Sequence, residues 1–349
     1  MNIKKIGLSA LAGSLAMFSA NAVEVAVSGK TEVTYVKKDV GSNGNPFGMG
    51  NAITFSGSGD VNGMTATYTA VLGDGGQANS NTSETFASSS LMLDMGDMGT
   101  IGFDQGVGEF GVGTIDDKTP YAYEEQWTNV GTSNGLRAAG GTNVIGYKNS
   151  YAGYNLSLEI DPGHTNNSIK GGTGDGGATG PGTTDSGYNF AITTSPAAGF
   201  NTGFGYGTEE ATTDSSNAKD ASFVTGYVTY AIGGATLGFQ MSDASGGATG
   251  AIGNQVMIAG VSYSVNENLA VSFSKMENEY ANGTSLTAAS GTVTSQAIGV
   301  DTTEDTTGLG ASYTMGSAAV RLLASQGTSI GGTAGNDEDH IELSLMLAF

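Results

Sequence analysis

Three patterns in this sequence contain residue types that catalysis or nucleotide binding uses. Gly131-Thr132-Ser133-Asn134-Gly135 has the Gly-x-Ser-x-Gly spacing that presents a serine nucleophile, and His164 and His340 are the only candidate bases. Gly106-Val107-Gly108-Glu109-Phe110-Gly111 has the spacing of a dinucleotide-binding loop. Both glycine patterns require a strand that leads into a helix, and neither has that context here. Because 58 of the 349 residues are glycine, chance matches are expected, and we predict that the protein is not an enzyme.

Carboxylates are the other side chains with a possible chemical role. The chain has 33 Asp and Glu residues against 12 Lys and Arg residues, a net charge of −21. Such a surface repels nucleic acid and attracts cations. The absence of cysteine excludes thiolate metal and redox chemistry and suits an oxidising compartment. The composition therefore excludes a nucleic-acid partner.

Two acidic clusters, Asp301-Thr302-Thr303-Glu304-Asp305 and Asn336-Asp337-Glu338-Asp339, allow two interpretations. The simpler one is solvation of an exposed loop. The other is binding of a divalent cation such as Ca²⁺, since clustered oxygens suit calcium. Neither cluster matches a defined calcium loop, so we predict no cofactor and assign no ligands.

The N-terminus has the three regions of a secretory signal peptide. Lys4 and Lys5 are the basic region, residues 6–18 the apolar region, and Ala20-Asn21-Ala22 a small-x-small cleavage site. We predict that residues 1–22 are removed after Ala22. No later apolar run reaches the ~18 residues of a membrane helix, so a membrane-spanning mature chain must be a closed β-barrel.

The C-terminus reads as a β-strand with one apolar face. Ile341, Leu343, Leu345, Leu347 and Phe349 alternate with more polar or smaller residues. A strand between hydrocarbon and water needs this alternation, and a terminal aromatic ring suits the membrane interface.

The same period-two pattern gives sixteen candidate strands between Gly, Asn, Asp and Pro residues. They span 24–37, 51–58, 63–72, 85–94, 99–105, 143–149, 153–160, 187–195, 199–207, 221–232, 235–242, 254–264, 268–276, 305–314, 318–326 and 338–349.

Short and long connections alternate strictly along these strands. An up-and-down meander places every second connection on the same side, so the pattern predicts an antiparallel transmembrane barrel with short periplasmic turns and long external loops. Sixteen strands leave an aqueous channel rather than a filled core. Inward positions should then be small or polar, as at Ser28, Lys30, Glu32 and Thr34, or at Ala270, Ser272 and Ser274.

Three segments in this order carry a family resemblance. Val27-Ser28-Gly29-Lys30 resembles an apolar-x-Gly-Lys segment of a first strand, and Gly108-Glu109-Phe110-Gly111 a Glu-Phe-Gly segment of a third loop. Arg137, followed by residues 143–150, is similar to a stretch that leads through a sixth strand. With the length, strand count, loop order and Phe349, these segments make the mature chain resemble the general-diffusion porins of the Gram-negative outer membrane.

The resemblance implies a homotrimer of barrels among outer-membrane lipid and lipopolysaccharide. It implies that the third loop, residues 106–142, folds into each barrel and forms the pore constriction. The constriction carboxylates would be Glu109, Asp116, Asp117, Glu124 and Glu125, facing a basic wall in which only Lys30 and Arg137 match the family. Ala52, Asp104 and Gln105 stand where the family often has arginine, so the basic wall is depleted.

We therefore expect residues 23–349 to form one barrel that passes small hydrophilic solutes and ions passively. A negative vestibule favours cations. One alternative is a substrate-selective porin, for example for sugars, with Tyr121, Tyr123 and Trp127 along the path. Packing of the loop against the wall is the other interpretation of these aromatic residues. A further alternative is a secreted acidic all-β surface protein without a pore.

Overall fold

A computed structural model describes residues 24–39, 44–73, 85–128, 130–131, 142–162, 186–209, 219–247, 254–280, 287–288, 291–292 and 302–349. The predicted signal peptide lies outside the described residues. So do Arg137, His164 and most of the Gly-x-Ser-x-Gly pattern.

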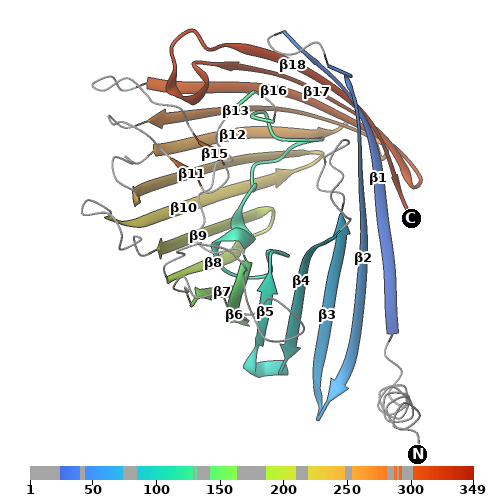
Figure 1. Cartoon of the computed structure of the whole chain (residues 1–349), viewed down its shortest axis with the longest axis vertical. Helices are drawn as coiled ribbons and strands as arrows, with labels where there is room; N and C mark the ends of the chain where they lie inside the picture. Colours follow the sequence, from blue (N-terminus) through green and yellow to red (C-terminus); the bar gives the residue numbers. More distant parts are fainter. Residues whose placement is uncertain are drawn as a thin grey trace, which may run out of the picture.

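Within the described residues, sixteen antiparallel strands close into one barrel (Figure 1). They are β1 (Glu24–Lys38), β2 (Phe47–Val61), β3 (Met64–Gly73), β4 (Thr85–Asp94), β5 (Thr100–Gln105), β6 (Thr142–Tyr151), β7 (Tyr154–Asp161), β8 (Gly187–Ala197), β9 (Phe200–Glu209), β10 (Lys219–Ile232), β11 (Ala235–Gly247), β12 (Asn254–Ser264), β13 (Leu269–Tyr280), β16 (Thr302–Met315), β17 (Ala318–Thr328) and β18 (Glu338–Ala348). A separate pair is formed by β14 (Thr287–Ala288) and β15 (Gly291–Thr292), and the short 3₁₀ helices are η2 (Gly96–Met98), η3 (Gly111–Ile115) and η4 (Ile330–Gly332).

The predicted all-β, sixteen-stranded antiparallel barrel is confirmed, and each predicted span overlaps one strand of it. The main differences lie at the long-loop ends. β2 begins at Phe47 rather than at residue 51, and β13 continues to Tyr280. The alternation is weak in these segments, but the neighbouring strand offers N–H and C=O groups that pairing satisfies. The β14–β15 pair within the predicted loop 277–304 was not predicted.

The barrel closes where the first and last strands meet. β18 pairs antiparallel with β1 from Lys38–His340 to Lys30–Ala348. Beyond this ladder, Gly29 and Phe349 exchange both backbone hydrogen bonds, at 2.8 and 2.9 Å. The Phe349 ring lies over Gly29, where a Cβ atom would meet it. The terminal aromatic residue therefore completes the seam and leaves no open sheet edge there.

The strands separate an apolar outer face from a polar inner face. On β18, Ile341, Leu343 and Leu345 are 44–47 % exposed on the outside, whereas Glu342 and Ser344 are buried inside the barrel. The same outward exposure is found for Val25, Val27, Val33 and Tyr35 of β1. This confirms the predicted faces of both strands. Hydrocarbon outside and water inside require this arrangement.

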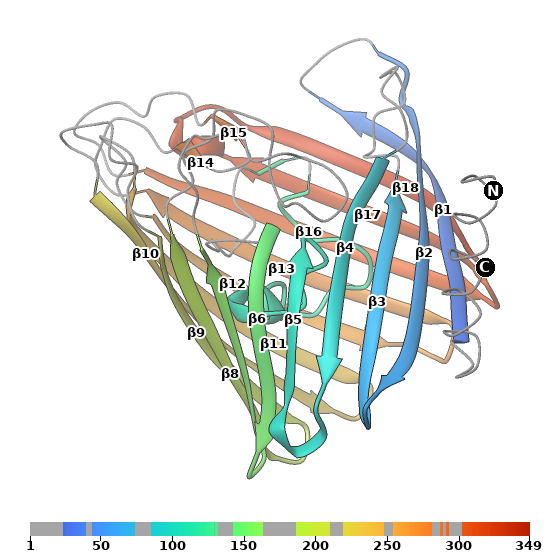
Figure 2. The same cartoon turned by 60° about the horizontal axis from the view of Figure 1, so that its bottom comes forward.

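The predicted short connections are confirmed as turns. The turns that join β2 to β3 and β4 to β5 lie at the same end of the barrel (Figure 2). In the described part of the chain, no helix is long and apolar enough to span a membrane.

Candidate functional site

The described part of the third loop, residues 106–128 and 130–131, is here called L3; it lies inside the ring of strands (Figure 1). Its root is held by Asp104 at the end of β5. The Asp104 carboxylate, 1 % exposed, accepts the backbone N–H groups of Val107 at 2.7 Å and Glu109 at 2.6 Å. Asp104 stands where the family often has arginine, and here it turns the chain into the lumen.

Phe110 fixes the next part of L3 against glycines of the wall. It is 1 % exposed, and Cβ atoms at Gly102 of β5 and Gly146 of β6 would both collide with its ring. Lys148 of β6 lies over the same ring, 5.6 Å from its centre, and forms an ion pair with Glu109 at 2.7 Å. The two glycines thus make room for an aromatic anchor.

This anchor gives a direct mutational test. Gly146→Ala places a methyl group into the Phe110 ring, so we expect a loss of about 1–3 kcal/mol of unfolding free energy, typical of overpacking. The measurement is the midpoint of heat-induced loss of folded mobility on a detergent gel. Gly226→Ala in β10 is the control, because its nearest non-local contact would be at 3.6 Å. Equal midpoints for both variants would contradict the assigned role of Phe110.

The 3₁₀ helix η3 lies against β7, β8 and β9. The backbone N–H of Gly111 donates to Ser157 Oγ at 2.8 Å, and that of Val112 to Asn189 Oδ1 at 2.7 Å. Val112 and Ile115 are fully buried and pack over Gly205, where a Cβ atom would approach both within 3 Å. β9 has a glycine at this inward position, and η3 occupies the space that a side chain there would fill.

Farther along, L3 crosses β11 and β13. Gln240, 1 % exposed, accepts the Lys118 N–H at 3.0 Å and donates to the Ile115 carbonyl at 3.2 Å. The Ala122 N–H donates to Ser272 Oγ at 2.9 Å, and Ser274 Oγ donates to Gln126 at 2.8 Å. Ser272 and Ser274 thus face inward as predicted, but they are covered by L3.

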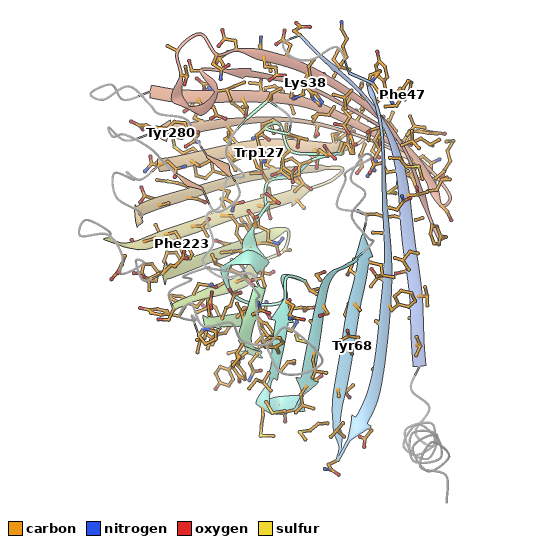
Figure 3. All side chains as sticks on the ribbon, viewed as in Figure 1. Lys38, Phe47, Tyr68, Trp127, Phe223 and Tyr280 are labelled. Carbon is orange, nitrogen blue, oxygen red and sulfur yellow. The ribbon has the colours of Figure 1, made fainter. Side chains whose placement is uncertain are left out.

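The three aromatic residues of L3 are packed rather than lined up along the passage. Trp127 is 8 % exposed, lies within the barrel (Figure 3), and packs with Val256, Ile258 and Met276. Tyr121 meets it edge-on, with ring centres 6.3 Å apart. These contacts favour the packing interpretation over a sugar path.

Tyr123 connects L3 to the seam of the barrel. Its hydroxyl contacts Glu32 of β1 at 2.9 Å and Glu342 of β18 at 2.8 Å. Arg321 of β17 lies 4.5 Å from the Tyr123 ring centre and forms an ion pair with Glu32. L3 is therefore held at both ends and spans the lumen.

The L3 contacts described above fall on strands between β5 and β18 and on β1, and none of them falls on β2 or β3. The inward faces of β2 and β3 carry small polar side chains, among them Thr54, Ser56, Thr67 and Thr69. These two strands therefore give the lumen a stretch of wall that carries hydroxyl groups.

Four carboxylates of L3 are crowded together. Burial, followed by repulsion from Glu342 and Glu125, raises the pKa of Glu124 to about 7. Burial in the lumen, together with repulsion from Glu125, also raises the pKa of Asp116 and of Asp117. Asp116, Asp117 and Glu125 repel one another electrostatically. Glu124 is also repelled by Glu342 and Glu32 at the seam of the barrel. Glu109 lies apart from these four, beside Lys148.

Among the described residues, no ladder of basic side chains is found opposite these carboxylates. Lys30 faces the lumen from β1 and is exposed, and Arg137 lies outside the described residues. Sequence reasoning missed Lys148 and Arg321, which pair with Glu109 and Glu32. The signal that would have found them is their inward parity on β6 and β17.

One acidic cluster differs from its predicted loop environment. Glu304 lies on β16, is fully buried, and accepts the Tyr280 hydroxyl at 2.7 Å and the Gly331 N–H at 3.0 Å. Asp305 pairs with Lys275 at 3.1 Å. Simple loop solvation was therefore the wrong interpretation for Glu304, since β16 begins earlier than predicted. Within the described ranges, no group of three or more His, Cys, Asp or Glu residues is arranged to hold a metal ion.

Ser325, His340 and Glu342 lie in the order of a hydrolytic triad. Ser325 Oγ is 3.2 Å from His340 Nδ1, and His340 Nε2 is 3.5 Å from Glu342. All three are at most 6 % exposed, and Glu342 already accepts the Tyr123 hydroxyl. A substrate carbonyl cannot reach the buried serine, so this row is a packing contact.

A closed barrel with an apolar exterior, a polar lumen and an inward loop defines a membrane channel. Solved structures with this fold include OmpF of Salmonella typhi in complex with daunomycin, at 15 % identity and TM-score 0.68, covering 94 % of this chain and 98 % of that one. A porin refined at 1.8 Å has 14 % identity and TM-score 0.64, with 93 and 100 % coverage. The trimer form of OmpT of Vibrio cholerae has 11 % identity and TM-score 0.62, with 94 and 100 % coverage. No curated protein matches this sequence.

The model of the Gram-negative porin family matches residues 7–347, so the chain belongs to that family. The family and the fold are those of a passive, non-enzymatic diffusion channel of the outer membrane.

Proposed function

We propose that this porin is a cation-selective channel for small hydrophilic solutes and ions. The supporting observation is that Asp116, Asp117, Glu124 and Glu125 lie close together on L3, which lies inside the barrel. Fixed negative charge in a narrow, low-dielectric passage concentrates cations and excludes small anions. Lys30 is the one predicted basic wall residue within the described ranges. In this proposal the pore has no cofactor.

The direct test is the reversal potential of the reconstituted channel in asymmetric KCl. The proposal expects the sign that corresponds to K⁺ permeating faster than Cl⁻. A zero or opposite reversal potential would remove the selectivity while leaving the passive channel in place.

The raised pKa of Glu124 predicts a pH-dependent preference. Below its pKa of about 7 the carboxyl group is protonated and neutral, and above that value it is charged. The preference for K⁺ should therefore increase between about pH 6 and about pH 8, and Glu124→Gln should flatten this increase. The measurement is the reversal potential across that range. A preference that falls as the pH rises would refute the role of this carboxylate.

We also propose that the mature chain begins after Ala22 and works as a homotrimer. The trimer form of OmpT supports the assembly. So does the outer face of this barrel, where Thr31 Oγ1 donates to Asn51 at 2.7 Å in mid-strand. Polar groups facing hydrocarbon are costly and suit a protein contact. N-terminal sequencing tests the cleavage site, and native mass spectrometry in detergent tests the trimer.

A further inference from the structure

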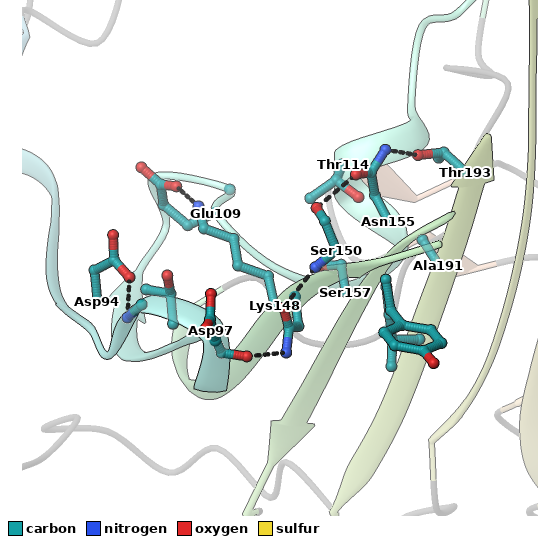
Figure 4. A pocket seen from close by; sticks show the side chains of 17 residues that line it. Asp94, Asp97, Glu109, Thr114, Lys148, Ser150, Asn155, Ser157, Ala191 and Thr193 are labelled. Atoms are coloured by element: carbon teal, nitrogen blue, oxygen red, sulfur yellow. Dashed lines mark hydrogen bonds and ion pairs between the residues drawn. The ribbon is translucent and has the colours of Figure 1, made fainter. Parts of the chain in front are cut away.

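A polar space lies between L3 and the end of the barrel where the short turns are. It is a cavity of about 1100 Å³ between the root of L3, the β4–β5 turn and the inner faces of β5 to β8 (Figure 4). Cavities that hold small ligands in proteins have volumes of this order. Because short turns face the periplasm in outer-membrane barrels, the cavity opens toward the periplasm.

Its wall is built from two rows of inward side chains. Strand pairing places Asp94, Thr100, Lys148 and Ser157 side by side on four successive strands. With a strand spacing of about 4.8 Å, this row is roughly 14 Å long. One level closer to the turns, pairing aligns Ser150, Asn155 and Thr193.

Both rows present hydrogen-bonding groups in fixed positions. Ser150 Oγ donates to Asn155 Oδ1 at 2.7 Å, and Asn155 Nδ2 donates to Thr193 Oγ1 at 3.2 Å. The hydroxyl of Ser157, 9 % exposed, accepts the Gly111 N–H at 2.8 Å and keeps its own proton as a donor. Such a surface matches the alternating donors and acceptors of a polyhydroxylated solute.

The charge of the cavity selects among such solutes. Lys148 is neutralised by Glu109, which forms part of the roof. Asp94 accepts the Gly96 N–H at 2.9 Å through one oxygen, and within the described residues the Asp97 carboxylate receives no hydrogen bond. Two carboxylates thus remain at one end of the rows, where they attract a positive group.

We propose that this cavity is a binding subsite for small hydroxylated amines, of the amino-sugar class, approached from the periplasmic side. The ammonium group lies near Asp94 and Asp97, and the hydroxyl groups lie along the row of Ser150, Asn155 and Thr193. The inference rests on the proposed channel function and adds a solute class to it. The subsite involves neither the aromatic residues of L3 nor its four crowded carboxylates, Asp116, Asp117, Glu124 and Glu125.

The experiment measures block of the ion current by glucosamine and by glucose, added to each side of a planar bilayer at mildly acidic pH. Glucosamine from the periplasmic side should block at a concentration at least about fivefold lower than glucose does. It should also act at a lower concentration from that side than from the other. Loss of one hydrogen bond to a charged group typically weakens binding by about tenfold. Asp97→Asn should therefore raise the half-blocking concentration by about fivefold or more, and Asn155→Ala, which removes a hydrogen bond between neutral groups, by about twofold or more.

Asn201→Ala is the matched control. Asn201 accepts from Ser195 Oγ at 2.6 Å in a similar Ser–Asn pair between β8 and β9, outside the cavity. Folded mobility on a detergent gel confirms that each variant forms a barrel. Equal block by glucose and glucosamine, or block unchanged in Asp97→Asn and Asn155→Ala, would overturn the inference. The reversal potential without sugar separates the two proposals: a retained cation preference with no selective block removes the subsite alone.

Discussion

Replacing Asp116, Asp117, Glu124 and Glu125 together by their amides is expected to remove most of the preference for cations. These carboxylates lie close together on L3 inside the barrel, and Lys30 is the one predicted basic wall residue within the described ranges. Fixed charges in a cleft raise local counter-ion concentration by about tenfold or more. The ratio of K⁺ to Cl⁻ permeability should therefore fall by roughly tenfold, as measured from reversal potentials in asymmetric KCl.

The matched control removes an equal number of carboxyl groups from the outside of the barrel. Asp243 of β11, Glu277 and Glu279 of β13 and Asp305 of β16 alternate with inward residues and face outward. Their replacement by amides should leave the reversal potential nearly unchanged. If the outer variant shifted it as far as the L3 variant, net charge rather than L3 would set the selectivity.

Gln240→Leu is expected to loosen the middle of L3. Gln240 satisfies both the Lys118 N–H and the Ile115 carbonyl across the lumen. Leucine is close in volume but leaves both groups without these partners, at about 1–3 kcal/mol each. Because L3 borders the passage, its increased motion should appear as several-fold greater noise in the open-channel current, recorded from single channels.

Ser242→Ala is the control for this variant. Ser242 is buried on the same face of β11 and bonds to Thr225 at 2.8 Å, not to L3. It should leave the current noise unchanged. A quiet Gln240→Leu channel with wild-type conductance would show that L3 is held without this glutamine.

Most of the barrel was predictable because its signal is local. The alternation of apolar and polar residues along a strand indicates which face contacts lipid, as at Ile341 and Leu343 near the C-terminus. Turn residues indicate where strands end. Strand ends near the long loops were less predictable. There Glu304 was predicted to lie in a loop, yet pairing with β13 continues through it. Backbone pairing depends on the neighbouring strand and needs no apolar pattern.

The site was predictable only in part. The carboxylates of the third loop were named through family resemblance, but the residues that hold the loop were not. Tyr123 and Glu342 are 219 positions apart, and Lys118 and Gln240 are 122 apart. Contacts over such separations depend on the path of L3 through the lumen, which no local pattern contains. The same applies to the ion pairs that occupy Lys148 and Arg321.

The strand number, the two faces of each strand and the alternation of short and long connections could be read from the amino-acid sequence, because they follow from a period of two and from turn chemistry. Which inward side chains are exposed depends on the three-dimensional fold. L3 covers Ser272 and Ser274, which strand parity alone would leave in water. Inward parity fixes only the direction in which a side chain points. Access to water depends on what else occupies the lumen.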